Sequence, residues 1–129
     1  MLQIMKLNHI DIQVSDVQRS SAFFQQHFGL TPVSNPSSPA IAILNDGHDF
    51  VLVLQHSEGA NYPEGFHVGF RVDDVQTVRD VHARVCAAGV TVSEVIVNGR
   101  GTHVYVTAPD GYFVELTCAR RAFHTPSTE

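Results

Sequence analysis

The sequence of 129 residues has little positive charge. It holds a single lysine, Lys6, and eight Lys and Arg residues in all, against thirteen Asp and Glu residues. The formal net charge is -5 at pH 7, and no run of basic residues occurs. Nucleic acids and anionic membranes attract proteins through clusters of Lys and Arg. The sequence therefore argues against either of them as a partner.

Long apolar runs and paired cysteines are also missing. No stretch approaches the roughly 18 apolar residues that span a bilayer, and the N-terminus lacks the apolar core of a signal peptide. The two cysteines, Cys86 and Cys118, are too far apart in sequence for a metal or redox pair. We expect a cytoplasmic protein with reduced thiols, in which Cys86 is a small core residue of a helix.

Two halves of the chain repeat one order of predicted elements. Residues 6–14 and 66–72 alternate between apolar and polar side chains, as half-buried strands do. Each strand leads into an amphipathic helix, near 16–28 in the first half and near 74–88 in the second. Ser15 or Asp16 could cap the first helix, and Asp73 or Asp74 could cap the second.

The remaining strands of each half follow its helix. In the first half, "AIAIL" and "FVLVLQ" flank an Asp-Gly turn and predict a hairpin. In the second half, "VTVSEVIV", "THVYVTA" and "YFVELTC" predict three strands, the last after another Asp-Gly turn. Internal repetition on this scale is a signal of fold. The sequence thus predicts an α+β protein of two βαβββ modules in a single domain, covering about residues 5–56 and 66–118, with a tail over 119–129.

Three polar residues occupy corresponding places in the modules. His9 and His67 stand near the starts of their strands, and Glu115 lies on the last strand. Each is on the face opposite the residues that pack on a helix, where burial is costly unless the side chain is paired or binds a cation. Two imidazoles and one carboxylate form the facial triad that holds a divalent metal and leaves positions open for a substrate.

The alternative is a set of hydrogen-bonded histidines without metal, which is the ordinary role of a histidine on a strand. The sequence leaves His103, on a predicted strand, undecided between these roles. Four further histidines are expected on helix surfaces, in a turn or in the tail, and they are His27, His48, His82 and His124.

Further residues are expected to line the same cavity. Alternation places Asp11, Arg71, His103 and Tyr105 on the faces of the three candidate ligands. Tyr105 could donate a hydrogen bond to an oxygen at the metal, or pack as an aromatic with its hydroxyl satisfied elsewhere. Arg71 and Arg100 could bind an anionic substrate, and Arg71 could equally form an ion pair with Asp11.

Residues 5–118 resemble the vicinal oxygen chelate superfamily, which includes glyoxalase I, fosfomycin and bleomycin resistance proteins and extradiol dioxygenases. The matching stretches are "NHIDIQVSDVQRSSAFFQQHFGL", "HVGFRVDDV" and "VYVTAPDGYFVEL". The last is the most specific, because its tyrosine, Pro-Asp-Gly turn and glutamate recur at that spacing. The resemblance implies a half-open, eight-stranded barrel around one divalent metal ion held by His9, His67 and Glu115. It also implies a homodimer whose sites are shared between subunits.

Departures from the family bear on the reaction. Glyoxalase I takes a fourth ligand, a glutamate, from its fourth strand, where this chain has Leu52 or Val53, and only Gln55 or His56 beyond could approach a metal. Extradiol dioxygenases use the three-ligand set, but the further histidine of their signature is missing, because residues 96–98 are Ile, Val and Asn. Fosfomycin-type transferases have a lysine-rich anion pocket with no counterpart here.

The sequence therefore predicts a metal-dependent enzyme that acts on a small molecule with vicinal oxygens, with dioxygenase-type chemistry slightly favoured. A glyoxalase-like lyase or a fosfomycin-type thiol transferase is an alternative. A metal-free binding protein of the bleomycin resistance type is another, although such proteins lack the ligands found here. The ligand set does not select among Fe, Mn, Zn and Ni.

Overall fold

The computed structural model describes residues 2–120 of the chain. Contacts within the chain group it into two compact units, residues 1–61 and 62–129. Residues 121–129, which include His124 and most of the predicted tail, lie outside the described residues.

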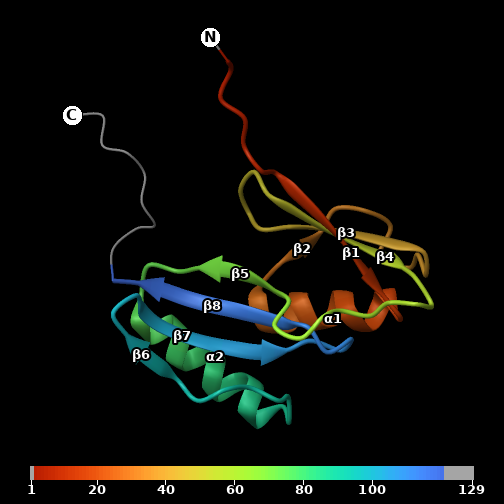
Figure 1. The fold of residues 1–129 in the computed structure, drawn as a ribbon. Coiled ribbons are helices and arrows are strands. Elements are labelled where there is room, and N and C mark those ends of the chain that lie inside the picture. Colours follow the sequence, from red (N-terminus) through yellow and green to blue (C-terminus); the bar gives the residue numbers. More distant parts are fainter. Residues whose placement is uncertain (1, 121–129) are drawn as a thin grey trace. The chain divides into compact units, whose positions relative to one another are not determined.

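The first unit is a four-stranded sheet with one helix (Figure 1). Its strand order is β1-β4-β3-β2, in which β1 runs parallel to β4 and the other neighbours are antiparallel. The elements are β1 (His9–Val14), α1 (Val17–Phe28), β2 (Thr31–Pro32), β3 (Ile41–Asn45) and β4 (Val51–His56).

The second unit repeats this plan. Its order is β5-β8-β7-β6, again with one parallel pair, β5 and β8. The predicted α+β class and the two βαβββ modules are confirmed. Each sheet is open at two edges, β1 and β2 in one and β5 and β6 in the other. The elements are β5 (His67–Arg71), α2 (Val75–Ala87), β6 (Ile96–Asn98), β7 (Gly101–Thr107) and β8 (Phe113–Ala119).

Both helices begin at an aspartate. The Asp16 side chain accepts a hydrogen bond from the backbone N–H of Arg19, and the Asp74 side chain accepts one from Gln76. Each aspartate thereby satisfies a backbone N–H group of the first helical turn that has no partner within the helix. Neither helix in the described part of the chain is long and apolar enough to span a membrane.

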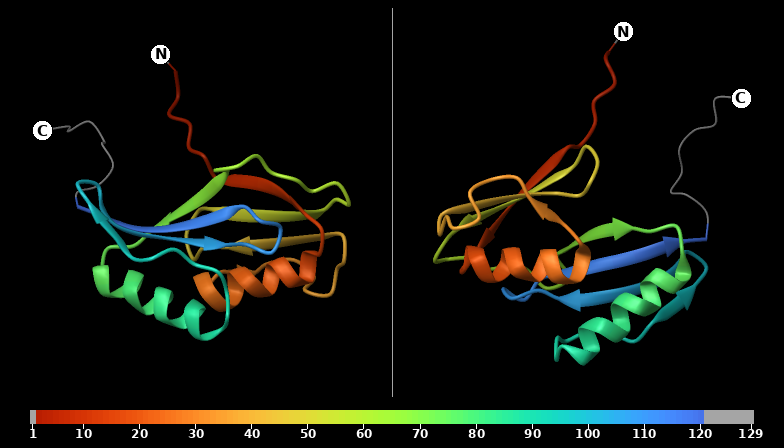
Figure 2. Two further views of the ribbon diagram at one scale, coloured as in Figure 1. Left: turned by 60° about the horizontal axis from the view of Figure 1, so that its bottom comes forward. Right: turned by 180° about the vertical axis from the view of Figure 1, so that it is seen from behind.

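Each helix covers one face of its own sheet (Figure 2). In the first unit, Phe24 of α1 is fully buried, and the residues that β1, β3 and β4 point to that side are apolar. In the second unit, Val78 and Val85 of α2 are buried in the same way. The strand residues of these two cores are Ile12, Val14, Ala42, Leu44, Leu52 and Leu54, and Val104, Val106, Val114 and Leu116.

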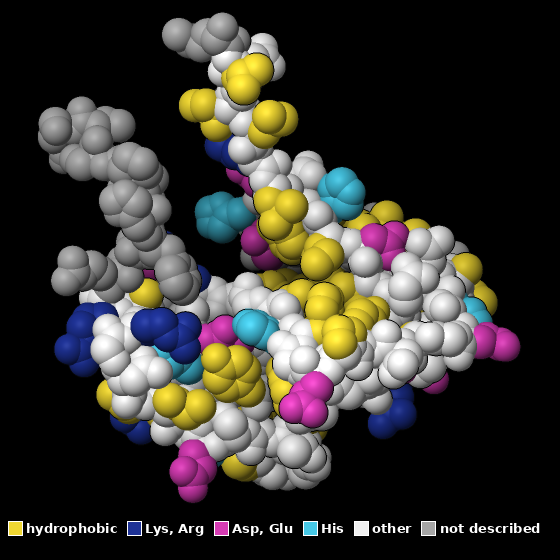
Figure 3. All heavy atoms as spheres, in the orientation of Figure 1, with side chains coloured by type: hydrophobic (Ala, Val, Ile, Leu, Met, Phe, Trp, Pro, Cys, Tyr) yellow, Lys and Arg dark blue, Asp and Glu magenta, His cyan; other side chains and the backbone are white. Residues whose placement is uncertain are grey.

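Two predicted strands are shorter than expected. The strand predicted from residue 6 begins at His9, and the segment before it exposes apolar side chains (Figure 3), namely Leu2, Ile4, Met5 and Leu7. The strand predicted over "VTVSEVIV" is reduced to β6 and one isolated bridge. There the Tyr105 N–H donates to the Ser93 hydroxyl, and this side-chain contact replaces a backbone bond of the ladder.

Two expected exposures are also wrong. His27, expected on a helix surface, is buried, because it lies on the core side of α1 with its ring 5.5 Å from that of Phe23. Cys86, expected in the core, is exposed on α2, where its sulfur lies 3.7 Å from Nε2 of His82.

Gly101, at the start of β7, allows the close approach of β7 to β8 to be tested. Gly101 has φ +136°, and a Cβ there would overlap the carbonyl oxygen of Cys118 and lie 2.9 Å from Cα of Ala119. Gly99, two residues earlier, has nothing within 4 Å of a Cβ. We expect Gly101→Ala to lower the free energy of unfolding by about 2 kcal/mol or more, and Gly99→Ala to change it by less than about 0.5 kcal/mol. Urea denaturation followed by circular dichroism measures both, and equal effects would contradict the close approach of β7 to β8.

Candidate functional site

The face of the second sheet that is turned away from α2 carries polar side chains. Cross-strand partners point to the same face of a sheet. Glu115 of β8 pairs with Gly69 of β5 and with Tyr105 of β7. Two residues further along β8, Thr117 pairs with Arg71 of β5 and with His103 of β7. Alternation along β5 adds His67 to this face. The register thus places four residues chosen from the sequence on the face of Glu115, namely His67, Arg71, His103 and Tyr105.

His67 and Glu115 face each other across β5 and β8. Nε2 of His67 lies 3.4 Å from Oε1 of Glu115, and the side chains are 44% and 11% exposed. Nδ1 of His67 lies 2.9 Å from the carbonyl oxygen of Gly65. A carbonyl oxygen only accepts, so Nδ1 carries the hydrogen, and in a neutral ring the lone pair of Nε2 points at the carboxylate. Two electron-pair donors that face one another, with the far ring nitrogen held by a carbonyl, fit a bound cation.

The second oxygen of Glu115 points into the sheet. Oε2 lies 3.3 Å from Nδ1 of His103, whose side chain is 1% exposed. The same Nδ1 contacts the Thr117 hydroxyl, and Nε2 of His103 lies 3.1 Å from Oδ1 of Asn98. Glu115 therefore has one oxygen beside the exposed His67 and the other in a buried polar contact.

The surroundings of Glu115 leave room on one side. A Cβ placed on Gly69 would lie 3.8 Å from Oε1 of Glu115, so the glycine keeps the carboxylate uncovered there. The half-buried ring of Tyr105 meets the ring of His67 edge to face, with 5.8 Å between the centroids. Tyr105 thus contacts the ring of His67 and is the cross-strand partner of Glu115.

The arginines lie further out. Arg71 forms an exposed ion pair with Asp73, 3.7 Å from NH2 to Oδ1. Arg100 is exposed in the turn between β6 and β7, and the neighbouring Gly101 pairs with Ala119, four residues along β8 from Glu115. Four residues of a strand span about 13 Å. Arg71 pairs with Thr117, only two residues along β8 from Glu115, so Arg71 is the nearer of the two arginines to the carboxylate along the sheet.

His9 has a similar setting on the first sheet. It is exposed on β1, and its Nδ1 lies 2.7 Å from the side-chain oxygen of Asn8. When Nδ1 donates to that oxygen, Nε2 of the neutral ring is free to bind a ligand. Asp11, two residues along the same face, accepts a hydrogen bond from Gln13.

The registers of the two modules identify the counterpart of Glu115 in the first one. Glu115 pairs with the residue two positions after His67, and Val53 pairs with the residue two positions after His9. Leu52 pairs with Ile10 and is 1% exposed on the helix side. Of the two residues that the sequence left open, Val53 is therefore the counterpart, and the first module lacks the corresponding carboxylate.

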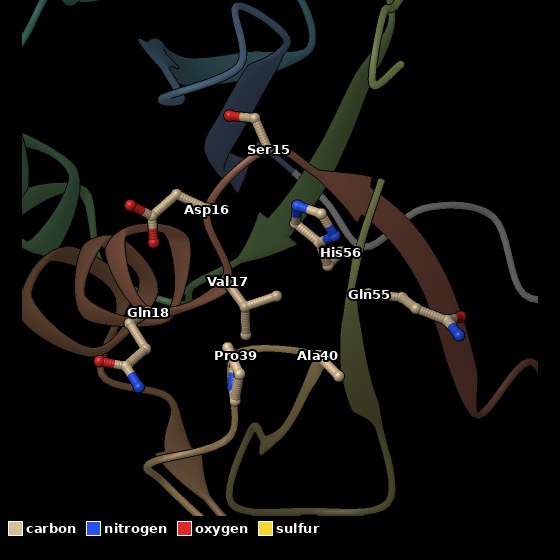
Figure 4. Close-up of a pocket in the computed structure, with 8 residues that line it drawn as sticks. All are labelled: Ser15, Asp16, Val17, Gln18, Pro39, Ala40, Gln55 and His56. Atoms are coloured by element: carbon tan, nitrogen blue, oxygen red, sulfur yellow. The ribbon is translucent and has the colours of Figure 1, made fainter. Parts of the chain in front are cut away.

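Neither polar residue at the end of β4 stands beside His9. Gln55 shares the face of His9, but it lies four residues, or about 13 Å, along β4 from Val51, which pairs with His9. His56 projects to the opposite side of the strand (Figure 4). There, with Asp16, it borders an open hollow of about 750 Å³ at the start of α1.

The face of the first sheet that carries His9 has an aliphatic patch on β3 and β4. Val51 lies opposite His9, Val53 lies opposite Asp11, and Ile43 of β3 pairs with Val53. All three aliphatic side chains are half-buried. Where the second module presents Glu115 and Tyr105, the first presents Val53 and Ile43.

The triad of His9, His67 and Glu115 stays a prediction. His67 and Glu115 stand together in one unit, and His9 belongs to the other. Within residues 2–120, no three His, Cys, Asp or Glu side chains are grouped so that they could hold a metal ion. Sequence reasoning missed Thr117 and Asn98. Alternation could have found Thr117, two residues after Glu115, whereas Asn98 required the register of β6 against β7.

Comparisons with known proteins agree with this architecture. The family model described as Glyoxalase/Bleomycin resistance protein/Dioxygenase superfamily matches residues 6–116. A solved structure from Bacillus cereus, described as a possible glyoxalase, is 30% identical, with a TM-score of 0.80 over 89% of this chain and 100% of its own. A comparison with curated proteins found no significant match.

Two further solved structures share the fold at lower identity. The fosfomycin resistance protein FosX from Listeria monocytogenes, complexed with Mn(II) and sulfate, is 22% identical, with a TM-score of 0.76 over 91% of this chain and 92% of its own. Lactoylglutathione lyase from Agrobacterium tumefaciens is 18% identical, with a TM-score of 0.72 over 87% of this chain and 92% of its own. At these identities the likeness extends to the fold alone.

Proposed function

This chain belongs to the glyoxalase/bleomycin resistance protein/dioxygenase superfamily, and we propose that it is a metal-dependent enzyme acting on a small molecule with two neighbouring oxygens. The observation that carries the proposal is the pair formed by His67 and Glu115. Nε2 of His67 lies 3.4 Å from Oε1 of Glu115, and the far nitrogen of His67 is held by the carbonyl of Gly65. The same pattern in metalloproteins orients a ligating histidine and fixes its tautomer.

The residues that would hold the metal are His67, Glu115 and His9. A divalent cation bound there supplies a Lewis acid, which stabilises negative charge on a substrate oxygen. Fe, Mn, Zn and Ni all suit two imidazoles and a carboxylate. The Listeria protein of the same fold was solved with Mn(II), so Mn(II) is the first metal to test.

The neighbouring side chains would bind and orient the substrate. The Tyr105 hydroxyl would donate a hydrogen bond to a substrate oxygen, and the contact of its ring with that of His67 supports this role. Gly69 leaves open the space beside the Glu115 carboxylate. Asp11 and Arg71 border the polar faces of their sheets, where they would contact the outer part of the substrate.

The surroundings of His9 favour dioxygenase-type chemistry on an aromatic diol. Val51, Val53 and Ile43 offer an apolar surface, which suits the ring of a catechol better than an anionic phosphonate. A lyase of the glyoxalase I type needs a base that moves a proton between carbons, and Val53 cannot serve. The single lysine gives little support to a fosfomycin-type transferase. A metal-free binding protein is the remaining alternative.

We propose a homodimer with sites shared between subunits, formed in the cytoplasm. One module supplies His9, and the other supplies His67 and Glu115. Both histidines are exposed and stand on edge strands, β1 and β5, so each is accessible to a second chain.

Metal binding is tested by titrating the purified, untagged protein with Mn(II) in a calorimeter. We expect one Mn(II) per chain, and His67→Ala or Glu115→Ala should weaken binding by more than about 100-fold, because each removes a ligand. The control is His82→Ala on α2, which should bind as the parent does. A parent that binds no metal, or variants that bind as tightly as the parent, would favour the metal-free alternative.

Sharing of the site between subunits is tested by mixing two inactive variants. His9→Ala and Glu115→Ala should each lose Mn(II) binding alone. After unfolding and refolding together in equal amounts, half of the dimers are mixed, and each mixed dimer has one intact site of two. Binding should therefore return to about a quarter of the parental capacity. A site built within one chain would give no recovery.

The reaction is tested by oxygen uptake of the Fe(II)-loaded protein with a catechol. We expect one dioxygen consumed per catechol, and Tyr105→Phe should lower kcat by about tenfold or more, because the hydroxyl acts on charge that develops during the reaction. Stability should change by less than about 0.5 kcal/mol. Consumption of the methylglyoxal–glutathione adduct instead, with no oxygen uptake, would assign a lyase.

A further inference from the structure

We propose that Phe113 determines the specificity of the site, because its ring forms an aromatic surface that favours substrates whose two neighbouring oxygens are attached to an aromatic ring. Phe113 was not among the residues chosen from the sequence. The inference rests on the proposed function in so far as the substrate oxygens bind at a metal beside Glu115. It adds the residue that recognises the remainder of the substrate.

The register of the second sheet places Phe113 on the face of the candidate site. Phe113 stands two residues before Glu115 on β8, and side chains two residues apart on a strand share a face. Phe113 is the cross-strand partner of His67 on β5 and of Thr107 on β7. Val114, the next residue of β8, is fully buried in the core beneath α2. The ring of Phe113 therefore lies on the face turned away from α2, beside a candidate metal ligand.

Two ring contacts connect Phe113 to His67 through Tyr105. The rings of Phe113 and Tyr105 meet edge to face, with 6.4 Å between the centroids and 75° between the planes. The rings of Tyr105 and His67 meet in the same way, at 5.8 Å and 83°. Aromatic rings prefer this geometry. The orientation of the Phe113 ring is thus linked to that of a candidate metal ligand.

Burial on this face changes along β7 and β8. At one end, the cross-strand pair of His103 and Thr117 is buried. At the other end, Phe113 and Tyr105 are half-buried, and His67 on the neighbouring β5 is exposed. Along β7 and β8, the free side-chain surface next to the carboxylate therefore lies toward the aromatic end.

The chemistry of the Phe113 ring decides what this surface recognises. The side chain holds no polar atom, so it acts by shape and through its aromatic face. Stacked or edge-to-face contact between aromatic rings adds about 3-fold to 10-fold to affinity beyond the burial of apolar area. An aliphatic group buries area on Phe113 without this contribution. Phe113 therefore favours an aromatic ring over an aliphatic group of the same size.

The spacing along β8 limits how far the ring of the substrate can stand from its oxygens. Phe113 and Glu115 are two residues apart, and two residues of a strand span about 7 Å. A ring that itself carries the two oxygens reaches Phe113 from a metal at Glu115, whereas a ring on a long chain extends past it. The geometry points to an aromatic ring with oxygens on adjacent carbons.

An aromatic ring beside a carboxylate also suits an organic cation. A metal bound at Glu115 neutralises that carboxylate and disfavours a second cation next to it. An organic cation is therefore an outcome of the test and not the ligand proposed.

The first experiment compares two chelators by calorimetry on the Mn(II)-loaded protein in the absence of oxygen. Catechol and acetohydroxamate both offer two neighbouring oxygens, but only catechol has an aromatic ring. We expect Phe113→Leu to lower the affinity for catechol about 3-fold to 10-fold, and that for acetohydroxamate by less than about 2-fold. Phe113→Tyr, which keeps the ring, should bind both within about 2-fold of the parent.

Phe28→Leu is the matched control, because it makes the same change at a half-buried position on α1 of the other unit. It should bind both chelators as the parent does. Equal losses for the two chelators in Phe113→Leu, or no loss for either, would overturn the inference.

The second experiment does not depend on metal. Phenol and cyclohexanol are similar in size and carry one hydroxyl each, but only phenol is aromatic. In NMR titrations of the metal-free parent, phenol should bind at least about 3-fold more tightly and contact the ring of Phe113. Phe113→Leu should remove the difference in affinity.

Three results of this experiment have opposite meanings for the two proposals. Equal affinities in the parent, or a preference for phenol that persists in Phe113→Leu, would overturn the inference. Binding of tetramethylammonium that is lost in Phe113→Leu would overturn it in favour of a cationic ligand. A parent that binds no Mn(II) but prefers phenol through Phe113 would refute the proposed function and leave the aromatic surface intact.

Discussion

A single helix covers each four-stranded sheet, so each sheet can bury only one of its faces in its own module. The two-residue period of a strand then divides its side chains between a helix-packed core and a second face. In the second module, Val104, Val114 and Leu116 lie on the core face. Glu115, between the last two of these in sequence, is left on the other face. The second module's part of the candidate site follows from this division, because its members occupy the positions of β5, β7 and β8 that face away from α2.

The two modules have the same strand order and pairing, but the side chains on their uncovered sheet faces differ. Parallel pairing of the first and last strands puts position 53 of one module where position 115 lies in the other. A valine at the first and a glutamate at the second give the two faces different chemistry. Duplication of the fold therefore does not duplicate the site.

Much of the fold could be read from local signals. Alternation, the aspartate caps and the Asp-Gly turns act over a few residues, and they predicted the two helices and most of the strands correctly. One error occurred where a neighbour far along the chain decides the outcome, and another within a helix. Ser93 interrupts a predicted strand because its hydroxyl meets the backbone of Tyr105. His27 is buried because the core side of α1 is wide enough to include it beside Phe23.

The sequence by itself determined which residues share a face, because the direction of successive side chains is a local property of a strand. It could therefore group His67 with Arg71, and Tyr105 with His103, before any strand was paired. Only the tertiary structure decided which of these meet. Pairing depends on the register between strands whose partners lie 46 residues apart in sequence, as Gly69 and Glu115 do. That register brought His67 to Glu115, identified Val53 as the counterpart of the glutamate, and placed Asn98 behind His103. Hydrogen bonds between distant strands fix such contacts, and no pattern within one strand encodes them.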